Sequence, residues 1–77
     1  MIEIRMPMLA AQPTRVIEIL VAVGDKALVD TAVVEVETEK ATALIPSTAE
    51  GIVREIIVEL GQMVSCDDLL IRIAPNE

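Results

Sequence analysis

The chain has 77 residues, which is enough for one small domain with a single hydrophobic core. Its net charge is −7 and its six Lys and Arg residues are scattered, which argues against a nucleic-acid partner. Because it contains no His and only one Cys, the usual zinc sites and His-based catalytic sites are excluded.

Hydrophobic residues make up 53% of the chain, but none is Phe, Tyr or Trp, so the core must be aliphatic and rich in β-branched side chains. These residues alternate with polar ones in short stretches separated by Gly, Pro, Asp and Ser, a pattern that predicts strands and no helix. In chain order we expect strands over residues 2–5, 15–22, 27–29, 33–38, 41–46, 51–58, 64–66 and 69–74. The expected turns are residues 24–25, 39–40, 46–51 and 61–62.

The two halves of the chain resemble each other. Sliding the sequence by 37 positions lays residues 16–36 over residues 53–73 without a gap, so that Gly24 meets Gly61 and Asp30 meets Asp67. The apolar residues stay in phase, and the candidates for inward-facing positions are Val23 with Leu60, Val34 with Ile71, and Val36 with Ile73. Since each half is too small to bury its own apolar face, we expect an all-β fold, a flattened barrel or sandwich of two small antiparallel sheets related by a pseudo-twofold axis.

The hairpin turn at Glu39-Lys40 departs from the usual turn chemistry. The strands predicted on either side leave only these two residues for the connection, and two-residue loops normally contain Gly or Asn because the favoured turns need positive φ. A rule broken at one place in an otherwise regular pattern indicates function there. Under the internal repeat, the counterpart of this tip is the end of the chain, so we expect the tip and the termini at opposite ends.

Residues 36–41, Val-Glu-Thr-Glu-Lys-Ala, resemble the lipoylation motif of lipoyl domains in the biotinyl/lipoyl attachment family, which has Asp or Glu before the lysine and Ala after it. The resemblance continues through residues 21–26, 45–47, 50–53 and 60–62 and covers essentially the whole chain. Residues 7–11, 13–15 and 29–31 depart from the family's pattern. These departures affect the surface that partners would recognise and leave the lysine motif intact.

The resemblance implies a carrier domain, with no catalytic or metal-binding residue of its own, that bears lipoic acid in amide linkage on Lys40, flanked by Glu39 and Ala41. It would act as a swinging arm that carries acyl groups and electrons between the active sites of a 2-oxo acid dehydrogenase complex. The implied partners are a thiamine diphosphate-dependent 2-oxo acid dehydrogenase, a dihydrolipoyl acyltransferase core, dihydrolipoyl dehydrogenase and a lipoylating enzyme. The isolated domain is expected to be monomeric, and residues 1–77 to form a single domain. The ending from residue 75 fits either the start of a linker in a longer chain or a true C-terminus, and both alternatives stay open.

Three alternatives remain open. A biotin carboxyl carrier domain shares the expected architecture, but its family places Met on both sides of the modified lysine, where this chain has Glu39 and Ala41. An unmodified lipoyl-like structural module would have no need of this motif at a tight turn. A small enzyme using paired carboxylates would need a pocket, for which a core of this size leaves little room.

The remaining expectations concern environment and packing. No apolar run approaches the length of a membrane span, so we expect no membrane partner and a protein of the cytoplasm, or of the mitochondrial matrix if the source is eukaryotic. Cys66 is expected to be a small buried residue on a short strand. Met6, Met8 and Met63 are expected to fill gaps in the core. A solvated outer face is expected for the acidic residues Glu35, Glu37, Glu39, Glu50, Asp67 and Asp68.

Overall fold

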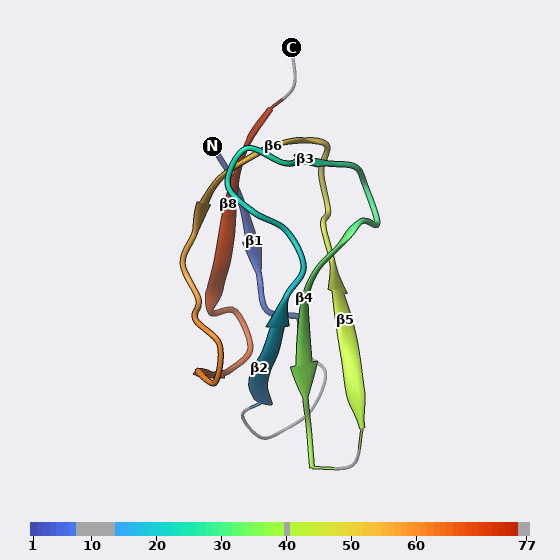
Figure 1. Ribbon diagram of the computed structural model, residues 1–77, viewed down its shortest axis with the longest axis vertical. Coiled ribbons are helices and arrows are strands. Elements are labelled where there is room, and N and C mark those ends of the chain that lie inside the picture. Colours follow the sequence, from blue (N-terminus) through green and yellow to red (C-terminus); the bar gives the residue numbers. More distant parts are fainter. Residues whose placement is uncertain (8–13, 40, 76–77) are drawn as a thin grey trace.

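The structure is a computed structural model that describes residues 1–7, 14–39 and 41–75. This part of the chain contains strands and turns and no helix, and therefore no helix that could cross a membrane (Figure 1). The strands are β1 (Ile2–Arg5), β2 (Thr14–Ile19), β3 (Lys26–Ala27), β4 (Ala32–Glu37), β5 (Thr42–Pro46), β6 (Gly51–Ile56), β7 (Met63–Val64) and β8 (Leu69–Pro75). Each strand expected from the sequence is present, and its ends differ from the expectation by at most a few residues.

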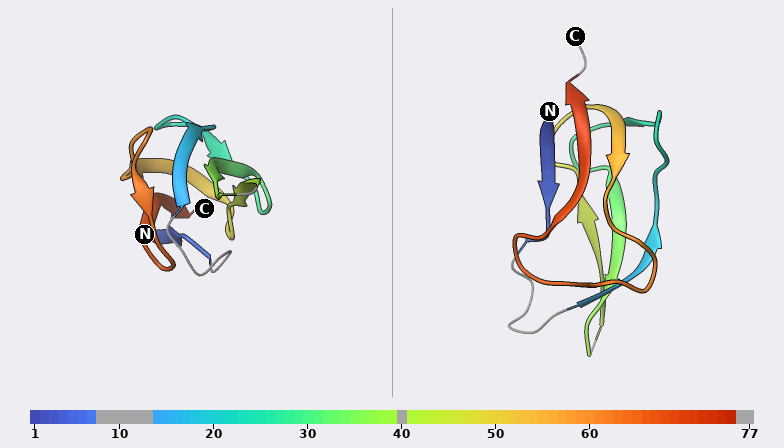
Figure 2. Two further views of the ribbon diagram at one scale, coloured as in Figure 1. Left: turned by 90° about the horizontal axis from the view of Figure 1, so that it is seen from below. Right: turned by 90° about the vertical axis from the view of Figure 1, so that its left-hand side faces the viewer.

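The strands form two four-stranded sheets whose pairings are all antiparallel. We refer to the sheet with strand order β1-β8-β6-β3 as sheet A and to the sheet with order β5-β4-β2-β7 as sheet B. The two sheets enclose the core between them (Figure 2), and the molecule measures 39 × 19 × 16 Å along its principal axes. The predicted all-β, flattened two-sheet architecture is confirmed.

The pseudo-twofold repeat is visible in the hydrogen bonds that join the two halves. The N–H of Gly24 donates to the carbonyl of Val53 at 2.8 Å, and 37 positions later the N–H of Gly61 donates to the carbonyl of Val16 at 2.8 Å. Each half therefore closes on the other through the same contact. Both glycines have positive φ, 98° at Gly24 and 85° at Gly61, which explains why Gly occupies each turn.

The repeat also relates β1 to β5, which a gapless comparison of the sequence does not reveal. Ile4 pairs with Ile71 in sheet A, and Ile45 pairs with Val34 in sheet B. Ile4 and Ile45 are 41 positions apart rather than 37, because eight residues connect β1 to β2 and only four connect β5 to β6. The extra four residues hide the relationship in the sequence.

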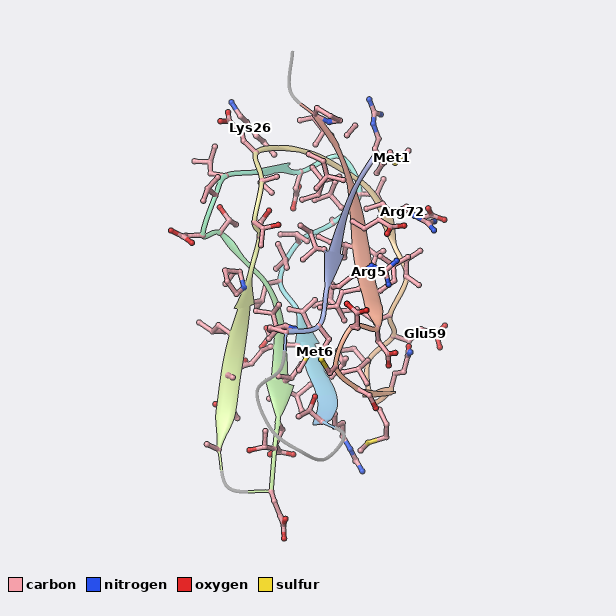
Figure 3. All side chains as sticks on the ribbon, turned by 180° about the vertical axis from the view of Figure 1, so that it is seen from behind. Met1, Arg5, Met6, Lys26, Glu59 and Arg72 are labelled. Carbon is pink, nitrogen blue, oxygen red and sulfur yellow. The ribbon has the colours of Figure 1, made fainter. Side chains whose placement is uncertain are left out.

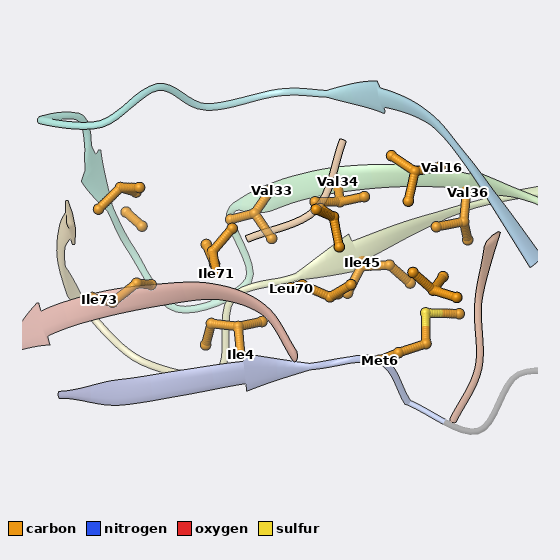
Figure 4. Packing of buried hydrophobic residues seen from close by; sticks show 14 residues of the cluster. Ile4, Met6, Val16, Val33, Val34, Val36, Ile45, Leu70, Ile71 and Ile73 are labelled. Carbon is orange, nitrogen blue, oxygen red and sulfur yellow. The ribbon is translucent and has the colours of Figure 1, made fainter. Parts of the chain in front are cut away.

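Among the described residues, 14 buried hydrophobic residues form the core, contributed by both sheets and by the loops at their ends (Figure 4). Val34, Val36, Ile71 and Ile73 are fully buried, as predicted. Strict alternation fails once in each half, because Val33 is buried beside Val34 and Leu70 beside Ile71. The strand pairing slips at both places, so an extra residue turns inward as expected of a β-bulge.

Several side chains predicted to be buried are on the surface. Val23 and Leu60 are 62% and 66% exposed, because each lies in the turn that precedes a positive-φ glycine and not on a strand. Cys66 is exposed in the turn after β7, and Met63 at the edge of sheet B is 52% exposed. Met6 is buried at 4% as predicted, and Met8 lies outside the described residues.

Candidate functional site

The β4–β5 hairpin forms one end of the long axis of the molecule, and the start of β1 and the end of β8 lie at the other (Figure 1). This is the separation that the internal repeat predicted. Lys40 lies outside the described residues, so the geometry of the site comes from its neighbours on both sides. The exposed residues Glu39 and Ala41 flank it in the chain.

Thr38 joins the two arms of the hairpin at its tip through both its backbone and its side chain. Glu37 pairs with Thr42 as the last pair of the β4–β5 ladder, and beyond it the N–H of Thr38 donates to the carbonyl of Ala41 at 2.7 Å. The hydroxyl of Thr38 donates to the same carbonyl at 2.9 Å and accepts the N–H of Ala41 at 3.1 Å. Three hydrogen bonds therefore join Thr38 to Ala41 across residues 39 and 40.

The turn is not one of the primed types. Types I′ and II′ both need positive φ at the first central residue, which is Glu39 here. Glu39 is not among the described residues with positive φ, which are Gly24, Asp30, Gly61 and Asp67. The conformation of Glu39 therefore does not require Gly or Asn at that position.

The role of Thr38 was not predicted from the sequence. The residue lies at the position where Ser and Thr hydroxyls bond to the backbone two or three residues further along, and that tendency was the available signal. The other lysine of the chain, Lys26, is at the opposite end of the molecule (Figure 3), where its Nζ lies 3.5 Å from Oε2 of Glu50. Its side chain is 53% exposed.

The outer faces of the two sheets differ in charge. On sheet A, Arg72 lies between two glutamates, with Nη1 2.7 Å from Oε1 of Glu55 and Nε 3.6 Å from Oε2 of Glu3 (Figure 3). The hydrogen bond from Arg5 and its positive charge lower the pKa of the Glu3 carboxyl. The hydrogen bond to Glu55 raises the pKa of the Arg72 guanidinium above its ordinary value.

On sheet B, which carries the hairpin, the position equivalent to Arg72 is Glu35. Glu35 pairs across the strands with Glu18, and Glu37 pairs with Arg15. Carboxylates placed directly opposite one another destabilise a sheet slightly. The face that leads to the hairpin is therefore more acidic than its counterpart. Of the acidic residues expected on an outer face, all but the half-buried Glu35 are exposed.

The described residues contain no group of three or more His, Cys, Asp or Glu side chains that could hold a metal ion. Between the hydrogen-bonded residues Thr38 and Ala41, the sequence places one primary amine, that of Lys40. Such an amine can accept an acyl group from an activated carboxylic acid to form an amide.

Comparison with known proteins agrees with this geometry. A biotin–lipoyl family model described as "Biotin-requiring enzyme" matches residues 2–73. Dihydrolipoyllysine-residue acetyltransferase components of pyruvate dehydrogenase complexes are 35% identical over 71 residues in Haemophilus influenzae and 36% identical over 70 residues in Azotobacter vinelandii. These alignments cover 92% and 90% of this chain but only 12% and 11% of the relatives, so the chain spans about a tenth of their length.

A solved structure shares the fold. The lipoyl domain of the 2-oxoglutarate dehydrogenase complex from Azotobacter vinelandii superposes with a TM-score of 0.77 at 23% identity, and the match covers 100% of both chains. Together with the family match over residues 2–73, this likeness shows that the chain belongs to the biotin–lipoyl family and has the fold of a lipoyl domain.

Proposed function

We propose that this domain is a lipoyl carrier in which lipoic acid is joined to Nζ of Lys40. The observation that carries the proposal is the position of this lysine in the chain. It lies between Glu39 and Ala41 in the sequence, and the described part of this hairpin, which Thr38 helps to close, is at the end of the molecule farthest from the start of β1 and the end of β8. A long flexible arm needs a fixed base, and a paired hairpin provides one.

The domain would be a substrate of the attachment reaction and not its catalyst. A lysine amine is mostly protonated at neutral pH, so a separate lipoylating enzyme must remove the proton and supply lipoate as an activated acyl donor. The amine nitrogen then forms the amide bond with the carboxyl carbon of lipoate, and the activating group leaves.

The proposed role of the loaded domain is to move acyl groups within a 2-oxo acid dehydrogenase complex. Lipoate held on Lys40 would supply a dithiolane able to carry an acyl group and electrons between a thiamine diphosphate-dependent dehydrogenase, an acyltransferase core that uses coenzyme A, and dihydrolipoyl dehydrogenase. Support comes from relatives named as acetyltransferase components of pyruvate dehydrogenase complexes.

Biotin is the second candidate, because the matching family model covers biotin-requiring enzymes as well as lipoyl domains. Lipoate is favoured by Glu39 and Ala41, which stand where a biotin carrier would have Met on both sides of the lysine.

The test is the intact mass of the domain after expression in a host that has both lipoylating and biotinylating enzymes and is supplied with both cofactors. We expect a mass increase of one lipoyl group, which fragmentation assigns to Lys40. The Lys40→Arg variant should lose the increase and the Lys26→Arg variant should keep it. A biotinyl adduct, or a folded domain that receives no adduct, would contradict the proposal.

A further inference from the structure

We propose that Thr38 is a positioning residue for the modification of Lys40, an inference that rests on the proposed function. The hydroxyl of Thr38 holds the backbone on both sides of residues 39 and 40 in one conformation. The lipoylating enzyme then meets a preformed turn instead of a flexible loop.

The geometry around Ala41 supports this role. Ala41 immediately follows Lys40, and both of its backbone polar groups are engaged by Thr38. The Ala41 carbonyl accepts from the Thr38 N–H and from the Thr38 hydroxyl, and the Ala41 N–H donates to that hydroxyl. Removal of the hydroxyl would eliminate two of these three hydrogen bonds and leave the strand pairing below the turn unchanged.

The closure of this hairpin differs from that of four other turns in the chain. In the turns at residues 22–25, 28–31, 59–62 and 65–68, the N–H of the first residue donates to the side chain of the fourth. The third residue of each of these turns has positive φ. At residues 38–41 the direction is reversed, because the side chain of the first residue accepts the N–H of the fourth.

Each of the four other turns contains a residue with positive φ. The turns at residues 22–25 and 59–62 are equivalent in the two halves, as are those at 28–31 and 65–68, and all four close with the same kind of hydrogen bond. At residues 38–41 the Thr38 hydroxyl supplies the side-chain hydrogen bond that closes the turn. If an enzyme must bind the lysine in one backbone geometry, its kcat/KM scales with the fraction of molecules that have that geometry. Thr38 therefore acts on the reaction through the population of the competent turn.

The experiment measures initial rates of lipoate transfer by a purified lipoate ligase, with the intact domain as the varied substrate. Thr38→Val removes the hydroxyl and keeps the branched shape, and Thr38→Ser keeps the hydroxyl. Thr42→Val is the matched control, since Thr42 is an exposed threonine on the other side of the same hairpin. Thermal unfolding and hydrogen exchange at the Ala41 amide are measured on each variant.

We expect Thr38→Val to lower kcat/KM roughly fivefold to tenfold, mainly through KM, as the loss of two modest hydrogen bonds predicts. The Ala41 amide should exchange faster in this variant, while the unfolding temperature changes little, because the core lies elsewhere. Thr38→Ser and Thr42→Val should behave as the original chain does. If Thr38→Val does not fold, Thr38→Ala, which removes the hydroxyl without adding a methyl group, replaces it.

Three outcomes would overturn the inference. They are an unchanged kcat/KM in the Val variant, an equal loss in Thr38→Ser, and an equal loss in Thr42→Val, which would indicate a general hydroxyl contact with the ligase. Failure of the proposed function is a different result, because the original chain itself would then accept no lipoate.

Discussion

Thr14 and Gly51 are equivalent residues in the two halves of the chain, and only Thr14 has room for a side chain. A Cβ atom on Gly51 would lie 2.1 Å from the backbone oxygen of Ala74 and 2.5 Å from Cγ2 of Ile73. Thr14 is buried at 2%, and among the described residues its Oγ1 is the buried side-chain polar atom without a hydrogen-bond partner. The pseudo-twofold symmetry is therefore broken at this position. Thr14 lies at the hairpin end of the molecule, and Gly51 lies at the end where β1 begins and β8 ends.

Gly51→Ala should destabilise the domain by about 2 kcal/mol, because the added methyl group meets backbone and must push β8 away from β6. Urea unfolding of both proteins measures the difference. Gly24→Ala is the comparison variant, since a Cβ on Gly24 meets nothing within 4 Å and its cost comes from the φ of 98° alone. If Gly51→Ala unfolds at the same urea concentration as the original chain, β8 can move away from β6 without any loss in the free energy of unfolding.

Thr14→Val should leave stability unchanged or raise it by about 1 kcal/mol. Valine has nearly the shape of threonine and removes a buried hydroxyl that has no partner, so the desolvation cost of that group disappears. The measurement is again the urea midpoint. A clear loss of stability would mean that the hydroxyl forms a hydrogen bond that its present surroundings do not show.

Much of this fold follows from the sequence, because the repeat and the alternation act together. Gly24 and Gly61 mark the same turn in each half, and the strands follow from the spacing of the aliphatic residues between such turns. The alternation of apolar and polar residues does not show where each strand ends. Val23 and Leu60 continue the apolar pattern beyond the strand ends, and only the turn geometry places them outside the core.

The site could be predicted in part. A lysine in a two-residue connection was evident from the sequence, whereas the closure of the turn depends on one hydroxyl that contacts both backbone groups of Ala41. The tendency of threonine hydroxyls to bond to the nearby backbone is statistical, and it does not say whether a particular threonine forms such a hydrogen bond. The equivalence of Ile4 and Ile45 was hidden for another reason, because the β1–β2 connection is longer than the equivalent β5–β6 connection.

The ion pairs on sheet A predict a pH dependence. The pKa of Glu3 is lowered, first by the hydrogen bond from Arg5, so its folded-state pKa lies below that of the unfolded chain. The carboxylate therefore contributes stability above the unfolded pKa, and this contribution is lost as the pH falls through the folded pKa. Glu3→Gln should unfold at a lower temperature than the original chain near neutral pH, and the gap should close in acid, once the pH has fallen through the lowered pKa of Glu3.

The contribution of Glu3 is small because these side chains are well exposed, and added salt should reduce it further. Melting curves of both proteins at neutral and acid pH test the prediction. A gap that stays constant with pH would point to packing by the glutamate side chain and not to its charge.

Charge near the hairpin should govern the encounter with the thiamine-dependent enzyme. We predict that Glu37→Lys slows reductive acylation of the lipoylated domain several-fold and leaves folding intact, because exposed charges steer association more than they stabilise a small fold. The control is Glu3→Lys, which makes the same change in net charge on sheet A and also breaks the pairs with Arg5 and Arg72. If Glu3→Lys slows acylation as much as Glu37→Lys, recognition does not centre on the hairpin.

The last prediction separates position from local sequence in the choice of Lys40. Lys26 is exposed, so exposure of a lysine cannot be the only feature that the lipoylating enzyme requires, and we expect the further feature to be the place of the lysine between Thr38 and Ala41. The double variant Glu39→Lys with Lys40→Glu keeps composition and charge but moves the amine by one residue, and successive residues in a turn direct their side chains differently. Ala41→Ser keeps the position and changes a neighbour.

Intact mass after expression with lipoate should show no lipoyl group on the shifted variant and full modification of Ala41→Ser. The Thr38–Ala41 hydrogen bonds are made by the backbone of residue 41 and by residue 38, so both variants can retain the closed hairpin. Hydrogen exchange at the Ala41 amide of the shifted variant verifies this. Efficient lipoylation of the Glu39→Lys, Lys40→Glu variant in a closed hairpin would contradict this prediction. Since the turn itself would be unchanged, the enzyme would then recognise the lysine by its exposure or by the neighbouring side chains.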